Sequence, residues 1–195
     1  KPGSLLDIGC AAGGFLAFMR DRGWSVRGVE LSAPVSAKAR SKGLDVLTGD
    51  ISSVGLPAGF FDVVCAGDIL EHASDPLDFL CRARSFSKDN GILYLALPRA
   101  DSLYYRFYLW LARFNHRNYF VLPHHLWHFS QKSLKALLSC AGWRVLEIQG
   151  ASSKILDRGL VKKIFGRTLQ IVSKIFNCQD RMIVIAQKIH DTTFS

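Results

Sequence analysis

Residues 5–14 read Leu-Leu-Asp-Ile-Gly-Cys-Ala-Ala-Gly-Gly, a short apolar run that passes directly into a glycine-rich turn. The apolar residues at 4–9 predict a buried strand, and the apolar stripe in residues 13–21 predicts a helix behind it. Glycines in such a turn let the backbone approach a ligand closely, and the first amides of the helix are free to bind it. The stretch therefore predicts the phosphate- or nucleoside-binding corner of an α/β fold.

The turn by itself does not identify the cofactor. It could be a dinucleotide fingerprint with Ala11 in the second glycine position, or an ordinary tight turn between a strand and a helix. Asp7, two residues before the first glycine, disfavours the dinucleotide, because a carboxylate there would face a pyrophosphate. A carboxylate suits a ligand with an ammonium group better.

Short strands and helices alternate along the first half of the chain. Strands are expected at 25–30, 44–48, 60–66 and 91–97, and helices at 33–42 and 76–86. Later residues predict a helix at 131–141, strands at 143–149 and 181–188, and a mainly helical stretch at 151–178. This alternation predicts a doubly wound α/β fold, a parallel sheet with helices on both faces. Ligands of such sheets lie at the carboxyl ends of the strands.

Polar or small residues stand at these strand ends. Glu30 ends the second strand, where a carboxylate can accept both hydroxyls of a ribose. Asp50 and Ile51 follow the third, where they could meet the amino group and the face of an adenine. Ala66 and Gly67 end the fourth and leave room for a ligand tail. Each signal is weak by itself, because loop residues also cap the helices that follow.

The order and spacing of these residues are more specific. The pattern Asp-x-Gly-x-x-x-Gly, an acid, Gly-Asp and then the run 61–76, with Leu-Glu-His-x-x-Asp-Pro, resembles the class I S-adenosylmethionine-dependent methyltransferases. The chain looks most like the group around the ubiquinone- and menaquinone-pathway enzymes, which residues 124–150 also resemble. The resemblance covers 4–98, 124–150 and the last strand. The family usually has Gly where Ala11 stands.

The resemblance implies one methyltransferase domain over residues 1–195, with a Rossmann-like, mostly parallel sheet of seven strands whose last strand is antiparallel. It implies S-adenosylmethionine as cofactor and S-adenosylhomocysteine as product. Carried over position by position, it assigns the methionine portion to Asp7, Gly9, Ala11 and Gly13, the ribose to Glu30 and Leu31, the adenine to Asp50 and Ile51, and the path to the methyl group to Ala66 and Gly67.

The acceptor is less defined. A base helps only where the acceptor is a hydroxyl or a similar weak acid, and histidine suits that task. The candidates are His72, His124, His125 and His128, of which His125 is favoured and His72 comes second. Each could instead be a structural residue. We expect methyl transfer to a small-molecule or lipid-like acceptor, at oxygen, and no metal site is predicted.

Three other functions stay open at this point. The positive charge would suit an RNA-modifying methyltransferase, although no recognised RNA-binding module is present, so a nucleic-acid partner is disfavoured. The chain could also be a methyltransferase-like module that binds the cofactor without turnover. A nucleotide-linked oxidoreductase is disfavoured by Gly49-Asp50 and by the run Glu71-His72 to Asp75-Pro76.

The net charge of +9 is concentrated in two segments. Segment 99–128 has a net charge of +3 and is rich in aromatic residues, and segment 151–178 has a net charge of +5 among many apolar residues. Both fall where substrate-recognising insertions occur in this fold, so we expect them to form a substrate lid. An amphipathic basic pattern is also typical of peripheral membrane contact, although packing on the core with outward charge explains it equally well.

The cysteine content and the first residues of the chain lead to two further expectations, about the redox environment and about the segment that precedes the first strand. The five cysteines show no spacing typical of a metal site or a redox pair, which favours a reducing, cytoplasmic environment, with the membrane surface as the alternative. The first strand starts at once and without an initiator Met, so we expect that helices preceding it in this fold are missing.

Overall fold

A seven-stranded sheet forms the centre of the computed structural model, which describes residues 2–102, 105–106, 125–151 and 179–190. The strands are β1 (Ser4–Ile8), β2 (Ser25–Glu30), β3 (Val46–Thr48), β4 (Phe61–Gly67), β5 (Ser87–Pro98), β6 (Trp143–Ala151) and β7 (Arg181–Lys188). Their order in the sheet is β3-β2-β1-β4-β5-β7-β6. The pairs among β1 to β5 are parallel, and β7 is antiparallel to both neighbours. The predicted fold is confirmed, including the antiparallel last strand.

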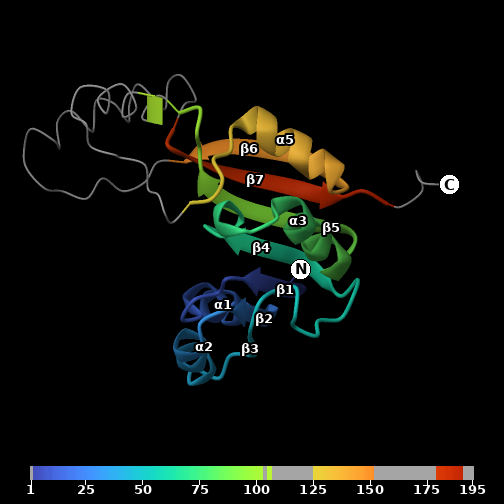
Figure 1. The fold of residues 1–195 in the computed structure, drawn as a ribbon. Coiled ribbons are helices and arrows are strands. Elements are labelled where there is room, and N and C mark those ends of the chain that lie inside the picture. The colour runs from blue at the N-terminus through green and yellow to red at the C-terminus, as the bar shows by residue number, and fades with distance from the viewer. Residues whose placement is uncertain (1, 103–104, 107–124, 152–178, 191–195) are drawn as a thin grey trace, which may run out of the picture.

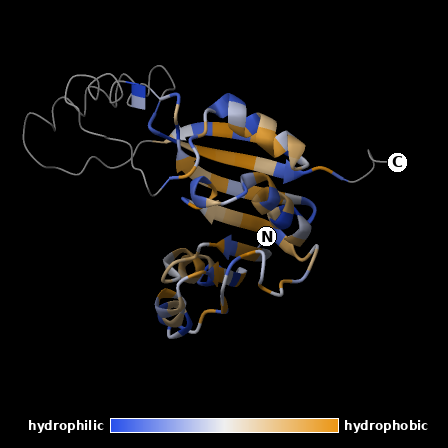
Figure 2. Ribbon diagram, viewed as in Figure 1, coloured by the Kyte–Doolittle hydropathy of each residue, from blue (hydrophilic) through white to orange (hydrophobic). Residues whose placement is uncertain are grey.

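Helices cover both faces of this sheet. They are α1 (Gly14–Arg20), α2 (Ala33–Arg40), the short 3-10 helix η1 (Leu70–His72), α3 (Pro76–Phe86) and α5 (Gln131–Cys140). In Figure 1, α1 and α2 lie beside the β1–β2–β3 half, and α3 and α5 beside the half that contains β4, β5, β7 and β6. The sheet has two hydrophobic cores, and neighbouring side chains of β1 belong to different ones. Leu5 packs in the core that contains Leu16 of α1, whereas Leu6 packs in the core that contains Leu80 of α3. Figure 2 shows the central strands as mainly hydrophobic.

Local sequence explains where the helices begin. At the start of α3, the Asp75 side chain accepts hydrogen bonds from the backbone N–H groups of Leu77 and Asp78, at 2.9 and 3.0 Å, and Pro76 fits the first turn. At the start of α5, Ser130 and Ser133 form a reciprocal capping box. These caps fix the loop between η1 and α3 and the junction between residues 125–129 and α5.

The predicted elements agree with the structure to within a few residues. The largest difference is β5, predicted at 91–97, which begins at Ser87 and passes an irregular step where Asn90 has a φ of 61°. Most of the two basic segments, including 107–124 and 152–178, lies outside the described residues, so the predicted helical stretch and the lid stay predictions. Within the described residues, no helix is both long and apolar enough to cross a membrane.

Candidate functional site

The glycine-rich turn after β1 is shaped by three residues with positive φ: Gly9 at 76°, Ala11 at 48° and Gly13 at 74°. The N–H groups of Gly9 and Cys10 both donate to the Val29 carbonyl of β2, at 2.8 and 3.1 Å. A Cβ at position 9 would lie 2.1 Å from Cδ1 of Ile69, so a residue larger than glycine would collide with the loop after β4. The turn is therefore held tightly between β2 and the tip of β4.

Glu30 connects the end of β2 to this turn. One oxygen of its carboxylate accepts the backbone N–H of Ala11 at 3.0 Å, and the other accepts the backbone N–H of Ser32 at 2.8 Å. Both oxygens keep a lone pair for a further donor. The side chain is thus fixed in place as a bidentate acceptor, which is what two neighbouring ribose hydroxyls require.

Asp50 lies at the tip of the neighbouring strand β3. Its Oδ1 accepts the backbone N–H of Ser52 at 2.8 Å, and hydrogen bonds from Ser52 lower the pKa of Asp50 below its ordinary value. Gly49 before it has a φ of 146°, a conformation that L side chains rarely adopt. Position 50 therefore carries an ionised carboxylate on a sharply bent loop.

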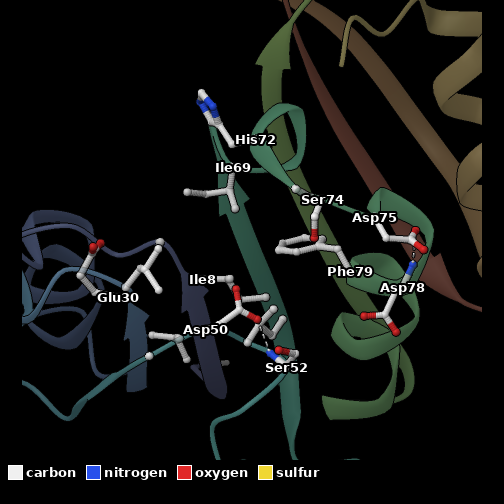
Figure 3. A pocket seen from close by; sticks show the side chains of 16 residues that line it. Ile8, Glu30, Asp50, Ser52, Ile69, His72, Ser74, Asp75, Asp78 and Phe79 are labelled. Carbon is white, nitrogen blue, oxygen red and sulfur yellow. Dashed lines mark hydrogen bonds between the residues drawn. The ribbon is translucent and has the colours of Figure 1, made fainter. Parts of the chain in front are cut away.

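These strand tips enclose a cavity of about 290 Å³. Figure 3 shows Glu30, Asp50 and Ser52 around one side, with Ile69, His72 and Phe79 around the other. Predicted site residues in its lining are Gly9, Glu30, Leu31, Asp50, Ile51 and His72. Apolar walls between two carboxylates match an adenine ring and its ribose, so the residues fit the adenosine part of the cofactor.

A second, larger hollow of about 700 Å³ lies beside the same turn. Its lining includes the predicted residues Asp7, Gly9, Ala11 and Gly67. Burial raises the pKa of Asp7 to about 7, and the pKa of the adjoining Cys10 thiol to about 12, with the charges of Asp7 and Glu30 contributing. Asp7 is thus a desolvated carboxyl group close to the turn, where an ammonium group would favour its charged form.

Two predicted cofactor residues have a different environment. Gly13 and Ala66 do not line either of these two cavities of the described chain. A Cβ at Gly13 would lie 2.4 Å from Cδ1 of Leu44 and 3.1 Å from Cβ of Ala39 in α2, so this glycine lets the turn pack closely against α2 and the segment after it. The Ala66 side chain is 1% exposed within the core. Their contribution is to the shape of the turn and the sheet.

The histidines meet at one edge of the first cavity. His72 lines it, and the rings of His72 and His125 are 4.9 Å apart, centroid to centroid, in an edge-to-face arrangement. The Glu71 carbonyl accepts the N–H groups of Leu126 and Trp127, at 2.9 and 3.1 Å, which anchors this later segment on η1. His128 lies further out, with its ring 6.3 Å from that of His125, and His124 lies outside the described residues.

Three features of the site were not predicted from the sequence. Ile69 and Phe79 supply apolar walls of the cavity. The Arg181 guanidinium, at the start of β7, pairs with Asp68 after β4, although 113 residues separate them. The Glu71 side chain is 1% exposed, and burial raises its pKa. Asp68, Ile69 and Glu71 belong to the run 61–76 that supports the family resemblance, whereas no sequence signal marked Phe79 or Arg181.

Comparisons with known proteins agree with this geometry. Residues 1–148 match the family model described as a methyltransferase domain. A ubiquinone biosynthesis O-methyltransferase of Caulobacter vibrioides is 32% identical over 100 residues, which is 48% of this chain and 40% of that enzyme. A malonyl-[acyl-carrier protein] O-methyltransferase of Enterobacter lignolyticus is 29% identical over 101 residues, 51% of this chain and 40% of that enzyme. The matches thus span less than half the length of these curated relatives.

The fold has counterparts among solved structures. A SAM dependent methyltransferase from Archaeoglobus fulgidus superposes with a TM-score of 0.69 at 22% identity, over 96% of this chain and 86% of that one. Since the family model spans β1 to β5 and extends into β6, the chain belongs to the methyltransferase domain family, with the fold and the S-adenosylmethionine cofactor of its class I enzymes.

Proposed function

We propose that the chain transfers a methyl group from S-adenosylmethionine to the oxygen of a small-molecule or lipid-like acceptor. The observation that carries the proposal is the position of His72, which lines the cavity of Glu30 and Asp50 and whose ring lies 4.9 Å from that of His125, centroid to centroid. Both relatives described above are named as O-methyltransferases, which supports the choice of oxygen.

The chain's own residues would divide the work as follows. Glu30 accepts the ribose hydroxyls, Asp50 and Ile51 hold the adenine, and Asp7 with the turn at Gly9 faces the methionine portion. When bound, the cofactor supplies a methyl group on a positively charged sulfur, which makes it a strong electrophile. The protein then has to align an acceptor lone pair and keep water away.

On the acceptor side, the proposal assigns His72 and His125 to the hydroxyl. The new oxygen–methyl bond forms as the methyl–sulfur bond breaks, the sulfur keeps that electron pair, and the hydroxyl proton has to leave. A ring nitrogen of one of the two imidazoles, His125 in the first place, would accept this proton. The predicted lid and any membrane contact would influence which acceptor is bound.

Within segment 99–128, the described Arg99 is 7% exposed and pairs with Asp101 at 2.8 Å, so its charge is not offered to a partner.

Transfer of a radiolabelled methyl group from S-adenosylmethionine tests the proposal. Phenols, catechols and carboxylic acids, each with and without an alkyl chain, form the acceptor panel, and an RNA pool is added as a competing class. Turnover of a hydroxyl or carboxyl acceptor, reduced at least tenfold in His125→Ala with S-adenosylhomocysteine affinity unchanged, is the expected result. Label incorporated only into RNA, or none with any acceptor, would reject it.

A further inference from the structure

Glu71 is a buried acid whose side chain accepts no hydrogen bond from the part of the protein that the structure describes. Its side chain is 1% exposed, and among the described residues neither carboxylate oxygen has a hydrogen-bond partner. Its backbone carbonyl, in contrast, accepts two N–H groups. A buried carboxylate without a partner is unfavourable, and native proteins rarely retain one unless a ligand satisfies it. The nearby cation of Arg181 is already paired with Asp68.

Two imidazoles stand next to this orphaned carboxylate. One ligand atom from each of Glu71, His72 and His125 lies within 4.8 Å of the others. Bonds of about 2.1 Å to a single ion place ligand atoms about 3–4 Å apart, so only small side-chain rotations separate this arrangement from a closed site. Glu71 is buried, His125 is half-buried and His72 is exposed toward the cavity.

The backbone around the three side chains is fixed by hydrogen bonds. Leu126 and Trp127 donate to the Glu71 carbonyl, and the indole Nε1 of Trp127 donates to the Ala73 carbonyl at 2.8 Å. The segment that carries His125 is therefore attached to both sides of η1. Such supporting contacts are what hold metal ligands in position.

We propose that Glu71, His72 and His125 bind a divalent transition-metal ion, for which zinc is the preferred probe. Two imidazoles and one carboxylate form a donor set typical of zinc and of its first-row neighbours, whereas magnesium and calcium prefer oxygen ligands. Glu71 then gains the partner that the described residues do not give it. The set escaped the sequence analysis because more than fifty residues separate His125 from the other two.

Three protein ligands leave a coordination position for a small molecule. Because His72 also lines the cavity, the open coordination position suits the oxygen of an acceptor. A bound cation would lower the pKa of that acceptor's hydroxyl group. The imidazoles would then act as ligands, and the ion would favour loss of the acceptor proton to solvent water instead of to an imidazole. This role rests on the proposed methyl transfer to oxygen, but the binding of the metal does not.

Titration of the untagged 195-residue chain with metal alone tests the site. After removal of metal by a chelator, calorimetry with zinc chloride should show one equivalent bound, and excess magnesium should not compete. Cobalt should give a visible spectrum without the charge-transfer band of thiolate ligands, which excludes binding by the exposed Cys81 and Cys140. Glu71→Gln, His72→Ala and His125→Ala should each weaken zinc binding at least tenfold. His190→Ala, at an exposed histidine beside Asp89, is the matched control and should stay within twofold of the wild type.

Thermal unfolding keeps the test independent of folding defects. Glu71→Gln should be at least as stable as the metal-free wild type, since it removes a buried charge, and should lose the zinc-induced rise in Tm. No zinc bound by the wild type, or equal affinity in all four variants, overturns the metal site. Zinc binding as expected, without turnover of any acceptor, would contradict the proposed function and leave the metal site standing. Full turnover in chelator-treated protein would reject the role of the metal while sustaining methyl transfer.

Discussion

The carboxylate of Glu30 accepts the backbone N–H of Ala11, with 3.0 Å between the two atoms. This bond joins the end of β2 to a turn residue whose φ is 48°. It gives Glu30 two tasks: the side chain holds the cofactor turn in shape and lines the cavity that fits an adenosine. The first two predictions follow from this relationship.

Glu30→Gln should weaken S-adenosylhomocysteine binding at least tenfold and lower the free energy of unfolding by about 1–2 kcal/mol. A glutamine has only one acceptor oxygen, so its amide nitrogen would face the N–H of Ala11 or of Ser32. Calorimetry and urea unfolding measure the two effects. Glu147→Gln, at an exposed position on β6, is the control and should change neither. Equal affinity in wild type and Glu30→Gln would contradict the role of this carboxylate.

Ala11→Gly should raise the free energy of unfolding by about 0.5–1 kcal/mol. A non-glycine residue in the left-handed region is strained by about 1–2 kcal/mol, and the greater freedom of glycine in the unfolded chain offsets part of the gain. Ala12→Gly is a matched control, because Ala12 is not among the residues with positive φ, and it should be destabilising. Similar losses in the two variants, measured by urea unfolding, would show that Ala11 is not strained.

Asp7→Asn should stabilise the chain increasingly as the pH rises from about 4 to about 7. The unfolded chain releases the Asp7 proton near its ordinary pKa of about 3.9, whereas the folded protein holds it up to about pH 7. Between these values the folded state binds more protons, so the wild type loses stability with rising pH, by up to about 4 kcal/mol, and the full loss persists above pH 7. Below pH 4 the carboxyl is protonated in both states and the effect vanishes.

Denaturant unfolding of the wild type and Asp7→Asn at several pH values measures this difference. Asp21→Asn, at an exposed position after α1, is the control and should not reproduce the gain. A difference between wild type and Asp7→Asn that does not change from pH 4 to pH 8 would contradict the buried, proton-holding Asp7.

Trp127→Phe should lower turnover several-fold without changing S-adenosylhomocysteine affinity. The substitution removes the Nε1 donor that holds the His125 segment on the Ala73 carbonyl, and leaves the adenosine cavity intact. Trp143→Phe provides a contrast, because it removes an indole hydrogen bond to the Leu80 carbonyl, and neither Trp143 nor Leu80 lines the cavity. It should lower stability and leave the turnover of folded enzyme unchanged. Unaltered turnover in Trp127→Phe would mean that the position of the histidine segment does not matter.

The element positions in the described part of the fold could be predicted because their signals are local, whereas the seven-stranded sheet with an antiparallel last strand was implied by the family resemblance. The apolar strands and the caps at Asp75 and Ser130 fix the element boundaries. The start of β5 was wrong by four residues because an irregular step at Asn90 interrupts the pairing with β4.

The site was predictable in part. Glu30 and Asp50 stand at strand ends, and parallel strands bring those ends together, so both line the same cavity. The packing of Gly13 against Leu44 and the pairing of Arg181 with Asp68 depend on which elements fold over one another. The burial of Glu71 likewise requires that residues 125–129 return over η1, which no local pattern encodes.

Calorimetry of the 195-residue chain with S-adenosylhomocysteine, and in parallel with NAD, tests the central claim most directly. The account predicts one equivalent of S-adenosylhomocysteine bound with micromolar or tighter affinity, at least a tenfold loss in Glu30→Gln, and no heat with NAD. Binding of NAD in its place, or S-adenosylhomocysteine affinity that Glu30→Gln leaves unchanged, would contradict it.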